Sequence, residues 1–381
     1  MTAVTEAIFD SGNEIVLAVT GGGVGAIAEL LTTPGASRCI LEATVPYSSS
    51  ALVALLGGQP DQYCSQPTAR AMAMACYERA RLLSSTPSSR EKQFVGVGCT
   101  ASLASDRPKL GDHRVHVAIQ TACSTSFASV RLIKGTRTRS EEDELASQLI
   151  LHFLKSEIHR ESFSGTSGGG EESVASKRFE APQGWINLLA GSCSWASGND
   201  SVTSGQQISC SDSKTAVYSG AFHPRHEGHQ QIARYAATKF DRIIHEISIR
   251  NVEKPPLDFY ELSERAAQFA PHEEIVFTCA ATFVEKARVF PSCTFIVGVD
   301  TIRRISQPKF YGGENERNAA IAELASLCTR FLVFGRNVGG TFCEFQSSEI
   351  DPALAKLCDG VAERDFRLDI SSTDLRAKGE L

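Results

Sequence analysis

The sequence has no run of apolar residues long enough to cross a membrane, which takes about 18 of them. Its first residues, MTAVTEAIFDSGNE, have neither the basic start nor the apolar core of a secretory signal. Positive charge is not in excess either, because 44 acidic residues outnumber 38 lysines and arginines and leave a formal net charge of −6. A general nucleic-acid binder usually carries a basic face. We therefore expect a cytoplasmic protein with no membrane partner and no nucleic-acid partner.

The 12 cysteines include no C-x-x-C pair. Several of them, Cys39, Cys76, Cys279 and Cys328, lie within apolar periodic runs. Buried small side chains in a reducing compartment are the ordinary use of such cysteines. We therefore predict neither a disulfide framework nor a zinc site, and no metal-ligating residues.

With 381 residues, 42% of them hydrophobic and 22% charged, the chain is long enough for two domains. The composition shifts over residues 161–213, where Ser, Gly, Asp and Gln surround the short apolar island Trp185–Ala190. Such a composition buries too little apolar surface to order itself fully. We predict a domain over 1–160, a Gly/Ser-rich linker with one docking turn over 161–213, and a second domain over 214–381.

The C-terminal part alternates short apolar runs with helical patterns. The expected strands are Ala216–Phe222, Ile243–Arg250, Ile275–Thr278, Thr294–Val299 and Phe331–Phe334. The expected helices are Gly228–Phe240, Phe259–Phe269, Thr282–Phe290, Asn315–Cys328 and Pro352–Val361. This alternation favours a parallel sheet covered on both faces, so the predicted fold class is α/β with a Rossmann-like layer. In such a sheet ligands bind beyond the carboxyl ends of the strands, where His226, Asp300 and Arg336 fall.

The N-terminal part predicts a second α/β domain with mixed strand order. Its expected strands are Ile15–Val19, Ala43–Tyr47, Gln93–Gly98 and Arg114–Thr121, and its expected helices are Val24–Leu31, Ala69–Arg81 and Glu141–Ile158. His113 and His116 lie three residues apart, and strand alternation would send them to opposite faces. We expect surface histidines there rather than a metal pair.

The segment SGAFHPRHEGHQ, Ser219–Gln230, predicts an anion site. It joins an apolar run to a helical pattern, and a helix N-terminus offers unpaired N–H groups and a positive dipole end. Gly220 and Gly228 let the backbone approach a ligand closely. His226 and His229 bracket the first turn, so both imidazoles can face one phosphate.

A second anion clamp is predicted near the C-terminus, where Ile370–Arg376 reads ISSTDLR. Hydroxyl groups open a helical turn there and an arginine follows on it. Two anion sites far apart in the sequence suggest one triphosphate held from two sides.

These segments together resemble the HxGH nucleotidylyltransferases. The first follows their GxFxPxHxGH signature and the last follows their ISSTxxR motif, while Phe295–Thr301, FIVGVDT, is similar to the VGxD segment of nicotinamide mononucleotide adenylyltransferases. The resemblance implies a catalytic role for His226 and His229, which hold the ATP phosphates, and for Arg376, which neutralises the pyrophosphate. The nucleotide-binding residues that it implies are Gly220, Ala221, Phe222, Gly228, Gly298, Asp300, Ser372 and Thr373. Of these, Ser372 and Thr373 cap the β- and γ-phosphates, and Asp300 contacts nucleoside hydroxyls or a magnesium water.

The implied reaction is attack of a mononucleotide phosphate on the α-phosphate of ATP, with pyrophosphate leaving. Nicotinamide or nicotinate mononucleotide is the expected acceptor, and Mg²⁺ enters with ATP. The family often has a tryptophan after VGxD that stacks on the pyridine ring, whereas this chain has QPKFYGG with Phe310 or Tyr311 in its place. The alternatives are adenylyl or cytidylyl transfer to another phosphorylated small molecule, or a non-catalytic nucleotide-binding or scaffold protein.

The N-terminal part resembles the CinA C-terminal domain, the nicotinamide-nucleotide amidase family. The resembling residues are Thr20–Gly22, Pro34–Ser37, Tyr47-Ser48, Leu55–Gly57 and Arg139–Glu141. Ala18, however, takes the place of the family's serine nucleophile, and Leu52 takes the place of the lysine that activates it. Cys99–Ser102 also departs from the TGxxGP-like loop.

A hydroxyl nucleophile is weak until a base activates it, so these departures predict a catalytically inactive domain. Such a domain would serve in assembly, as part of a homo-oligomer, or in passive nucleotide binding. Residual amidase activity with Thr20 as nucleophile is the alternative.

Overall fold

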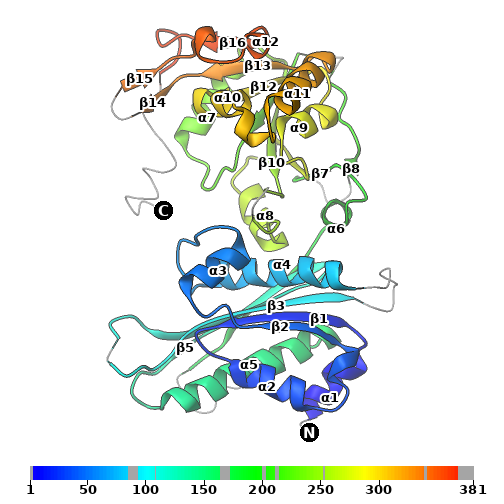
Figure 1. Cartoon of the computed structure of the whole chain (residues 1–381), viewed down its shortest axis with the longest axis vertical. Coiled ribbons are helices and arrows are strands. Elements are labelled where there is room, and N and C mark those ends of the chain that lie inside the picture. The colour runs from blue at the N-terminus through cyan, green and yellow to red at the C-terminus, as the bar shows by residue number, and fades with distance from the viewer. Residues whose placement is uncertain are drawn as a thin grey trace. The chain divides into compact units, whose positions relative to one another are not determined.

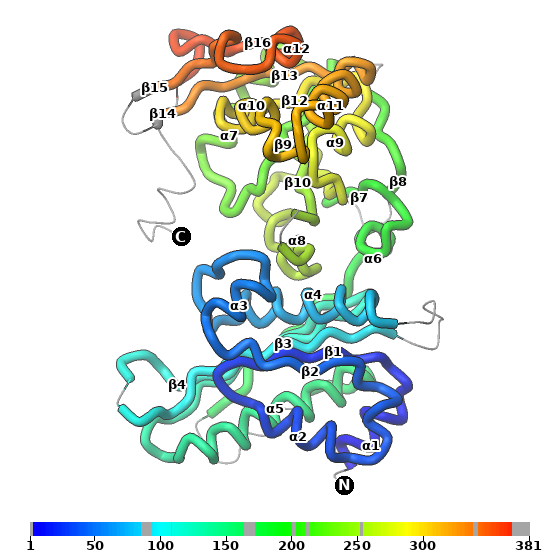
Figure 2. The backbone as a smooth tube through the Cα atoms, in the orientation of Figure 1, coloured from blue at the N-terminus to red at the C-terminus, as the bar shows by residue number. Residues whose placement is uncertain are grey.

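The computed structural model describes residues 3–84, 93–107, 109–163, 172–199, 203–210, 214–251, 254–338 and 341–367; Figure 2 draws the others in grey. The chain forms two compact units. Unit 1 comprises Met1–Ala181 and Asn251–Glu261, and unit 2 comprises Pro182–Arg250 and Leu262–Leu381. The α/β fold class with two units is therefore confirmed, and the structure places the division between them at residue 181 rather than at a linker.

The sheet of unit 1 has six strands in the order β2-β1-β3-β4-β5-β6. They are β1 Glu14–Thr20, β2 Ile40–Thr44, β3 Phe94–Ser102, β4 His113–Gln120, β5 Ser124–Leu132 and β6 Ala175–Glu180. The pairs that β1 makes with β2 and β3 are parallel, and the pairs from β3 to β6 are antiparallel. The predicted mixed strand order is thus present.

Helices cover both faces of this sheet (Figure 1). On one face lie α1 Ala3–Asp10, α2 Val24–Thr32 and α5 Arg139–His159, and on the other lie α3 Ser49–Leu56 and α4 Gln66–Leu83. A short 3-10 turn, η1 Ala36–Arg38, precedes β2. A capping box in which Thr138 and Glu141 bond reciprocally fixes the start of α5.

Unit 1 also takes in Asn251–Glu261, a segment distant in sequence, and a buried cation holds it there. Arg70 on α4 is 2% exposed and pairs with Asp258 and Glu261, both at 3.4 Å. Its guanidinium lies 4.7 Å from the centroid of the Tyr260 ring. Removing one partner of a buried ion pair costs far more than removing one on the surface, so Arg70 is a strong anchor for this segment.

The main sheet of unit 2 has eight strands in the order β16-β13-β12-β9-β10-β11-β7-β8. They are β7 Trp195–Ser197, β8 Ser204–Gly205, β9 Thr215–Ser219, β10 Arg242–Ser248, β11 Glu274–Thr278, β12 Thr294–Gly298, β13 Arg330–Phe334 and β16 Cys358–Val361. The six strands from β16 to β11 are parallel, and β7 and β8 extend the edge in antiparallel pairs. A separate two-stranded ribbon pairs β14 Arg336–Val338 with β15 Thr341–Cys343.

Helices lie on both faces of this sheet as well. The α-helices are α6 Gln183–Ala190, α7 Glu227–Ala236, α9 Phe283–Val289, α10 Val299–Ile305, α11 Glu314–Ser326 and α12 Pro352–Ala355, and the 3-10 turns are η2 Pro308–Phe310 and η3 Ser347–Glu349. Helix α8 Phe259–Ala266 begins in the segment of unit 1 and ends in unit 2. Side chains of α9 to α12 share one core cluster with Phe295 and Phe331 of the sheet. On the other face, Trp185 of α6 packs on Phe277 and Tyr235 of α7 packs on Phe334. The predicted doubly covered parallel sheet is therefore present.

Three expectations need correction. The range 161–213 is not a linker in its described residues, because β6 adds to the edge of β5 while Trp185 anchors α6 against the other sheet. The expected helix Pro352–Val361 stops at Ala355, and its second half is strand β16, which gains backbone hydrogen bonds from the edge of β13. None of the 12 cysteines, all of which the structure describes, forms a disulfide, but Cys279 is only half-buried and Cys328 is exposed rather than buried as expected.

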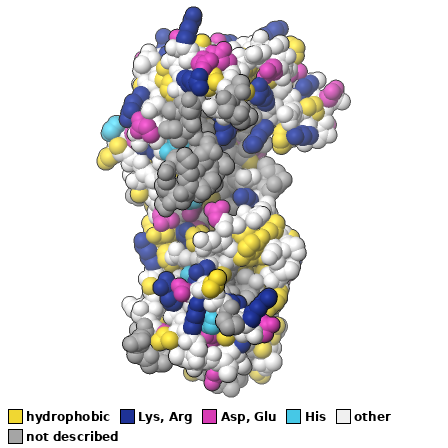
Figure 3. All heavy atoms as spheres, turned by 90° about the vertical axis from the view of Figure 1, so that its left-hand side faces the viewer, with side chains coloured by type: hydrophobic (Ala, Val, Ile, Leu, Met, Phe, Trp, Pro, Cys, Tyr) yellow, Lys and Arg dark blue, Asp and Glu magenta, His cyan; other side chains and the backbone are white. Residues whose placement is uncertain are grey.

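No helix among the described residues combines the length and the apolar character that crossing a membrane requires. On the face drawn in Figure 3, basic and acidic side chains are interspersed.

The close packing of β3 on α4 leads to a stability prediction. A Cβ atom on Gly96 would lie 2.0 Å from the Ala73 carbonyl oxygen and 2.2 Å from the Tyr77 nitrogen. Both are backbone atoms of a helix and cannot rotate away. We expect Gly96→Ala to lower the free energy of unfolding by about 1–3 kcal/mol or more, measured by urea denaturation. Gly111→Ala is the matched control, because its Cβ would meet open space; an equal loss in both variants would contradict the packing argument.

Candidate active site

The candidate site of unit 2 lies where strand order reverses. Strand β9 sits between β12 and β10 although β12 comes later in the chain, so the crevice between β9 and β12 is the topological switch point. Ligands of doubly wound sheets bind at that point, beyond the carboxyl ends of the strands. The GxFxPxHxGH segment leaves β9 there, and the VGVD segment leaves β12 there.

His226 and His229 form a stacked pair at the start of α7. Their ring centroids are 3.8 Å apart, and their planes differ by 26°. His226 is the N-cap residue: the Gly228 N–H donates to its Nδ1 at 3.1 Å, and its own N–H donates to Nδ1 of His229 at 3.2 Å. The two imidazoles thus act as a capping box and satisfy backbone donors that helices otherwise leave open.

This capping also determines the tautomer. An Nδ1 atom that accepts a hydrogen bond carries no proton, so in each neutral ring the proton is on Nε2. Burial, together with the smaller effects of the neighbouring His226, Arg225 and His245, lowers the pKa of His229 to about 3. Burial lowers the pKa of His226 as well. The pair therefore offers neutral Nε2–H donors at a helix N-terminus, an arrangement suited to phosphate oxygens.

The loop between β9 and α7 is held by side chains from the segment that connects β10 to β11. Arg265 donates to the Ala221 carbonyl at 2.9 Å, and Gln268 donates to the Phe222 carbonyl at 3.2 Å. Arg225 pairs with Glu273, and its backbone N–H donates to Gln268 Oε1 at 2.7 Å. Burial raises the pKa of Glu273, but the hydrogen bonds from Arg225 and the Ala270 N–H and the nearby positive charge together outweigh burial, and the net shift is downward.

Phe222 fixes the turn from inside. Its φ of 46° is left-handed, its side chain is 1% exposed, and its ring lies 5.0 Å from that of His229 and 5.7 Å from that of His245. His245 on β10 is also buried, and burial lowers its pKa to about 4. The side chain of Phe222 therefore serves in packing. The prediction that Phe222 contacts a nucleotide now applies to its backbone groups.

Gly298 and Asp300 lie at the end of β12, as expected. Gly298 is the N-cap of α10, and a Cβ there would meet nothing within 4 Å. Asp300 in the first turn pairs with Arg336 at 2.7 Å, and both side chains are substantially exposed. The structure therefore joins two of the predicted strand-end residues directly. Phe310, in the turn η2 after α10, is an exposed aromatic, and burial raises the pKa of Tyr311 beside it.

The terminal motif, with Ser372, Thr373 and Arg376, lies outside the described residues, so its contacts stay a prediction. The residues just before it are placed. The Phe366 ring lies 5.7 Å from that of Tyr235 on α7 and 5.1 Å from that of Phe334 at the end of β13. The last described residues before the motif therefore pack against α7, whose N-cap is His226.

In unit 1 the positions of the expected nucleophile and base are apolar core. Ala18 on β1 and Leu52 on α3 belong to one buried cluster with Leu56, Met72 and Cys76. Thr20 donates to the Pro46 carbonyl at 2.9 Å and is 9% exposed. Residues Cys99–Ser102 are not a loop but the last part of strand β3.

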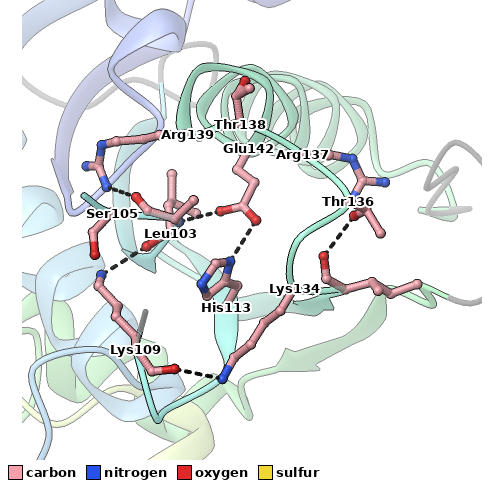
Figure 4. Close-up of polar contacts among 12 residues, drawn as sticks. Leu103, Ser105, Lys109, His113, Lys134, Thr136, Arg137, Thr138, Arg139 and Glu142 are labelled. Atoms are coloured by element: carbon pink, nitrogen blue, oxygen red, sulfur yellow. Dashed lines mark hydrogen bonds and ion pairs between the residues drawn. The ribbon is translucent and has the colours of Figure 1, made fainter. Parts of the chain in front are cut away.

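A polar cluster joins the start of α5 to the neighbouring segments of unit 1 (Figure 4). Glu142, fully buried, accepts from the Ala104 N–H at 2.6 Å and pairs with Nδ1 of His113 at 2.7 Å. Arg139 donates to the carbonyls of Ala104 and Gly21 at 2.9 and 3.1 Å. The surface role expected for His113 is therefore wrong, because a buried carboxylate needs this partner.

Sequence reasoning missed a buried polar cluster around Glu246 and Lys286. It lies in unit 2, on the face of the sheet opposite to His245. The signal was present, since HEIS interrupts an apolar strand with a charged residue. Pairing across the strands was needed to interpret it. Among the described residues no group of three or more His, Cys, Asp or Glu side chains could hold a metal ion.

The fold and the site together define a two-unit α/β protein with a histidine-capped helix N-terminus at the switch point of the parallel sheet of unit 2. No family model matches the sequence, and no curated protein matches it.

Solved structures similar to part of the chain include proteins of the CinA superfamily. A competence/damage inducible protein from Agrobacterium tumefaciens is 18% identical, covers 42% of this chain and 97% of its own, and has a TM-score of 0.32. A competence or damage-inducible protein from Enterobacter asburiae is 14% identical, covers 41% and 96%, and has a TM-score of 0.33. A CinA superfamily protein from Escherichia coli is 15% identical, covers 40% and 86%, and has a TM-score of 0.31. The larger part of the chain lies outside each likeness.

The buried histidine pair leads to a titration prediction. The ring signals of His229, followed by NMR, should show no protonation step between pH 8 and 5, because burial lowers its pKa to about 3. In denaturant the same histidine should titrate near its unperturbed pKa of about 6.5. Since the unfolded chain then binds the proton first, the free energy of unfolding should fall as pH drops below about 6.5. A folded-state transition near pH 6.5 would contradict the proposed tautomer.

Proposed function

We propose that unit 2 is an adenylyltransferase that joins ATP to a pyridine mononucleotide and releases pyrophosphate. One observation carries the proposal. Two neutral histidines with Nε2–H donors cap a helix N-terminus at the switch point of a doubly wound sheet. Phosphoryl and nucleotidyl transfer need little covalent work from the protein and depend on positioned donors at the phosphates, which this turn supplies.

The roles follow the site. His226 and His229 donate to the phosphates of ATP and stabilise the charge that develops on the α-phosphate. Gly220 and the backbone after it face the acceptor. Asp300, oriented by Arg336 at 2.7 Å, is available to nucleoside hydroxyls or to a water on the Mg²⁺ that ATP brings.

The terminal motif can join this site by chain length alone. Ser372 follows Phe366 by six residues, which span up to about 20 Å when extended. Phe366 contacts Tyr235, and His229 precedes Tyr235 along α7 by about 9 Å of helix rise. This geometry supports the proposal that Arg376 neutralises the pyrophosphate of the same ATP.

The acceptor is the less constrained part of the proposal. Nicotinamide or nicotinate mononucleotide is favoured by the FIVGVDT segment, with Phe310 as an exposed ring for stacking. The direct test incubates the full chain with ATP, Mg²⁺ and each acceptor and follows pyrophosphate and the dinucleotide. Turnover of a phosphopantetheine or an alcohol phosphate, with none of the pyridine nucleotides, would replace the acceptor. Nucleotide binding without turnover of any acceptor would favour the scaffold alternative.

A substitution of the second histidine tests the site itself. His229→Ala should lower kcat/KM by a hundredfold or more, about 3 kcal/mol of transition-state stabilisation, because a preorganised donor is lost. His152→Ala, on the exposed face of α5 in unit 1, is the matched control and should leave turnover unchanged. Turnover by His229→Ala within threefold of the unsubstituted protein would exclude this role.

We propose further that unit 1 is catalytically silent. The full chain should release no ammonia from nicotinamide mononucleotide, because Ala18 and Leu52 supply neither nucleophile nor base. The full chain is required, since β6 and Asn251–Glu261 complete unit 1 beyond residue 160. Ammonia release that Thr20→Ala abolishes would show instead that this threonine has become the nucleophile.

A further inference from the structure

A buried cluster, here called the strand-end network, lies at the carboxyl ends of three strands of unit 2. It consists of Ser219 on β9, Glu246 on β10, Thr278 on β11 and Lys286 on α9. Thr278 donates to Oε1 of Glu246 at 2.6 Å, while Ser219 at 2.5 Å and Lys286 at 2.6 Å donate to Oε2. Lys286 also donates to the Ser219 hydroxyl at 2.7 Å. Both oxygens of the carboxylate are therefore occupied.

The network is expensive to bury. Glu246 is fully buried, Lys286 is 7% exposed, and Thr278 is fully buried. The free-energy cost of removing two charges from water can exceed the energy of their mutual attraction. Apolar residues of similar size therefore often replace such buried pairs without loss of stability. A role in positioning would explain why charges occupy this place in the sheet.

What the network positions is the start of the histidine loop. The Gly220 N–H donates to the Glu246 carbonyl at 3.0 Å, directly after Ser219. A Cβ on Gly220 would lie 3.1 Å from the Phe222 ring, so this glycine and that ring are closely packed. Phe222 in turn packs on His229. The contacts therefore run without a gap from Glu246 to the histidine.

The network also lies on one side of the switch point. Its strands are β9, β10 and β11, whereas the Asp300–Arg336 pair follows β12 and β13. In the proposed reaction, on which this inference rests, the Gly220 backbone faces the acceptor and α7 faces the ATP phosphates. We infer that Glu246 and Lys286 are positioning residues for the acceptor half of the site.

The experiment compares Glu246→Gln with Glu274→Gln in the full chain. Glu274 on β11 pairs with Arg242 on β10 at the amino ends of these strands, whereas Glu246 and Thr278 pair near their carboxyl ends. Both Glu274 and Arg242 side chains are about one-third exposed. Glu246→Gln should raise the KM for the mononucleotide at least tenfold while the KM for ATP stays within twofold. Glu274→Gln should leave both constants unchanged. A merely structural role would lower kcat through the fraction of folded protein and move neither KM selectively.

Ser219→Ala serves where Glu246→Gln does not fold. It removes one hydroxyl from the network and keeps the ion pair, and the same selective rise in the mononucleotide KM is expected, with a smaller size. Equal changes in the two KM values, or no change, in folded variants would overturn the inference.

A second readout is independent of turnover. Hydrogen exchange of the amides from Gly220 to Arg225 should accelerate in Glu246→Gln or Ser219→Ala, while exchange in β12 stays unchanged. Unaltered exchange in this loop would overturn the inference even if the protein catalyses the proposed reaction. If the unsubstituted protein turns over no acceptor, the proposed function fails, and faster exchange in the variants would still establish that the network positions the loop.

Discussion

The two hydrogen bonds between backbone N–H groups and histidine Nδ1 atoms at the start of α7 are the constraint on which the site of unit 2 depends. They cap the helix, stack the two rings 3.8 Å apart and leave the ring protons on the Nε2 atoms. A protonated ring could not accept at Nδ1, so the geometry requires neutral imidazoles. Burial of His229 against Phe222 supplies that condition by lowering the pKa of the ring. The two hydrogen bonds thus link the start of α7, the neutral state of the two imidazoles and the position of their Nε2–H donors.

Strand β10 supports this turn from both faces of the sheet. Because side chains alternate along a strand, consecutive residues point to opposite faces. His245 packs with Phe222 and Phe269, and Phe222 in turn packs on His229. Glu246, the next residue, gathers Ser219, Thr278 and Lys286 on the other face. The consecutive residues His245 and Glu246 therefore place a neutral imidazole on one face of β10 and a charged network on the other.

In unit 1, apolar side chains occupy the two positions where the sequence resemblance led us to expect a nucleophile and a base. Ala18 and Leu52 lie in one apolar cluster with Leu56, Met72 and Cys76. The buried polar residues of unit 1 are used for structure instead. Glu142 joins His113 to the backbone near Ala104, and Arg70 holds the segment Asn251–Glu261. These groups are paired, which buried charges and hydrogen-bonding groups require.

The sequence by itself determined the α/β class, the five inner parallel strands of unit 2 and the histidine turn, because these depend on local periodicity, glycine placement and capping within a few residues. It also predicts, from the residue types at positions 18 and 52, that unit 1 has neither nucleophile nor base there. It did not show that β6 extends the sheet of unit 1 while α6 packs on the sheet of unit 2, because both depend on which edge or face is exposed elsewhere in the fold. Only the tertiary structure decided that Glu246 meets Lys286 and that Asp300 meets Arg336. These partners come from elements far apart in the chain, and pairing across a folded sheet has no signature in the spacing of either residue alone.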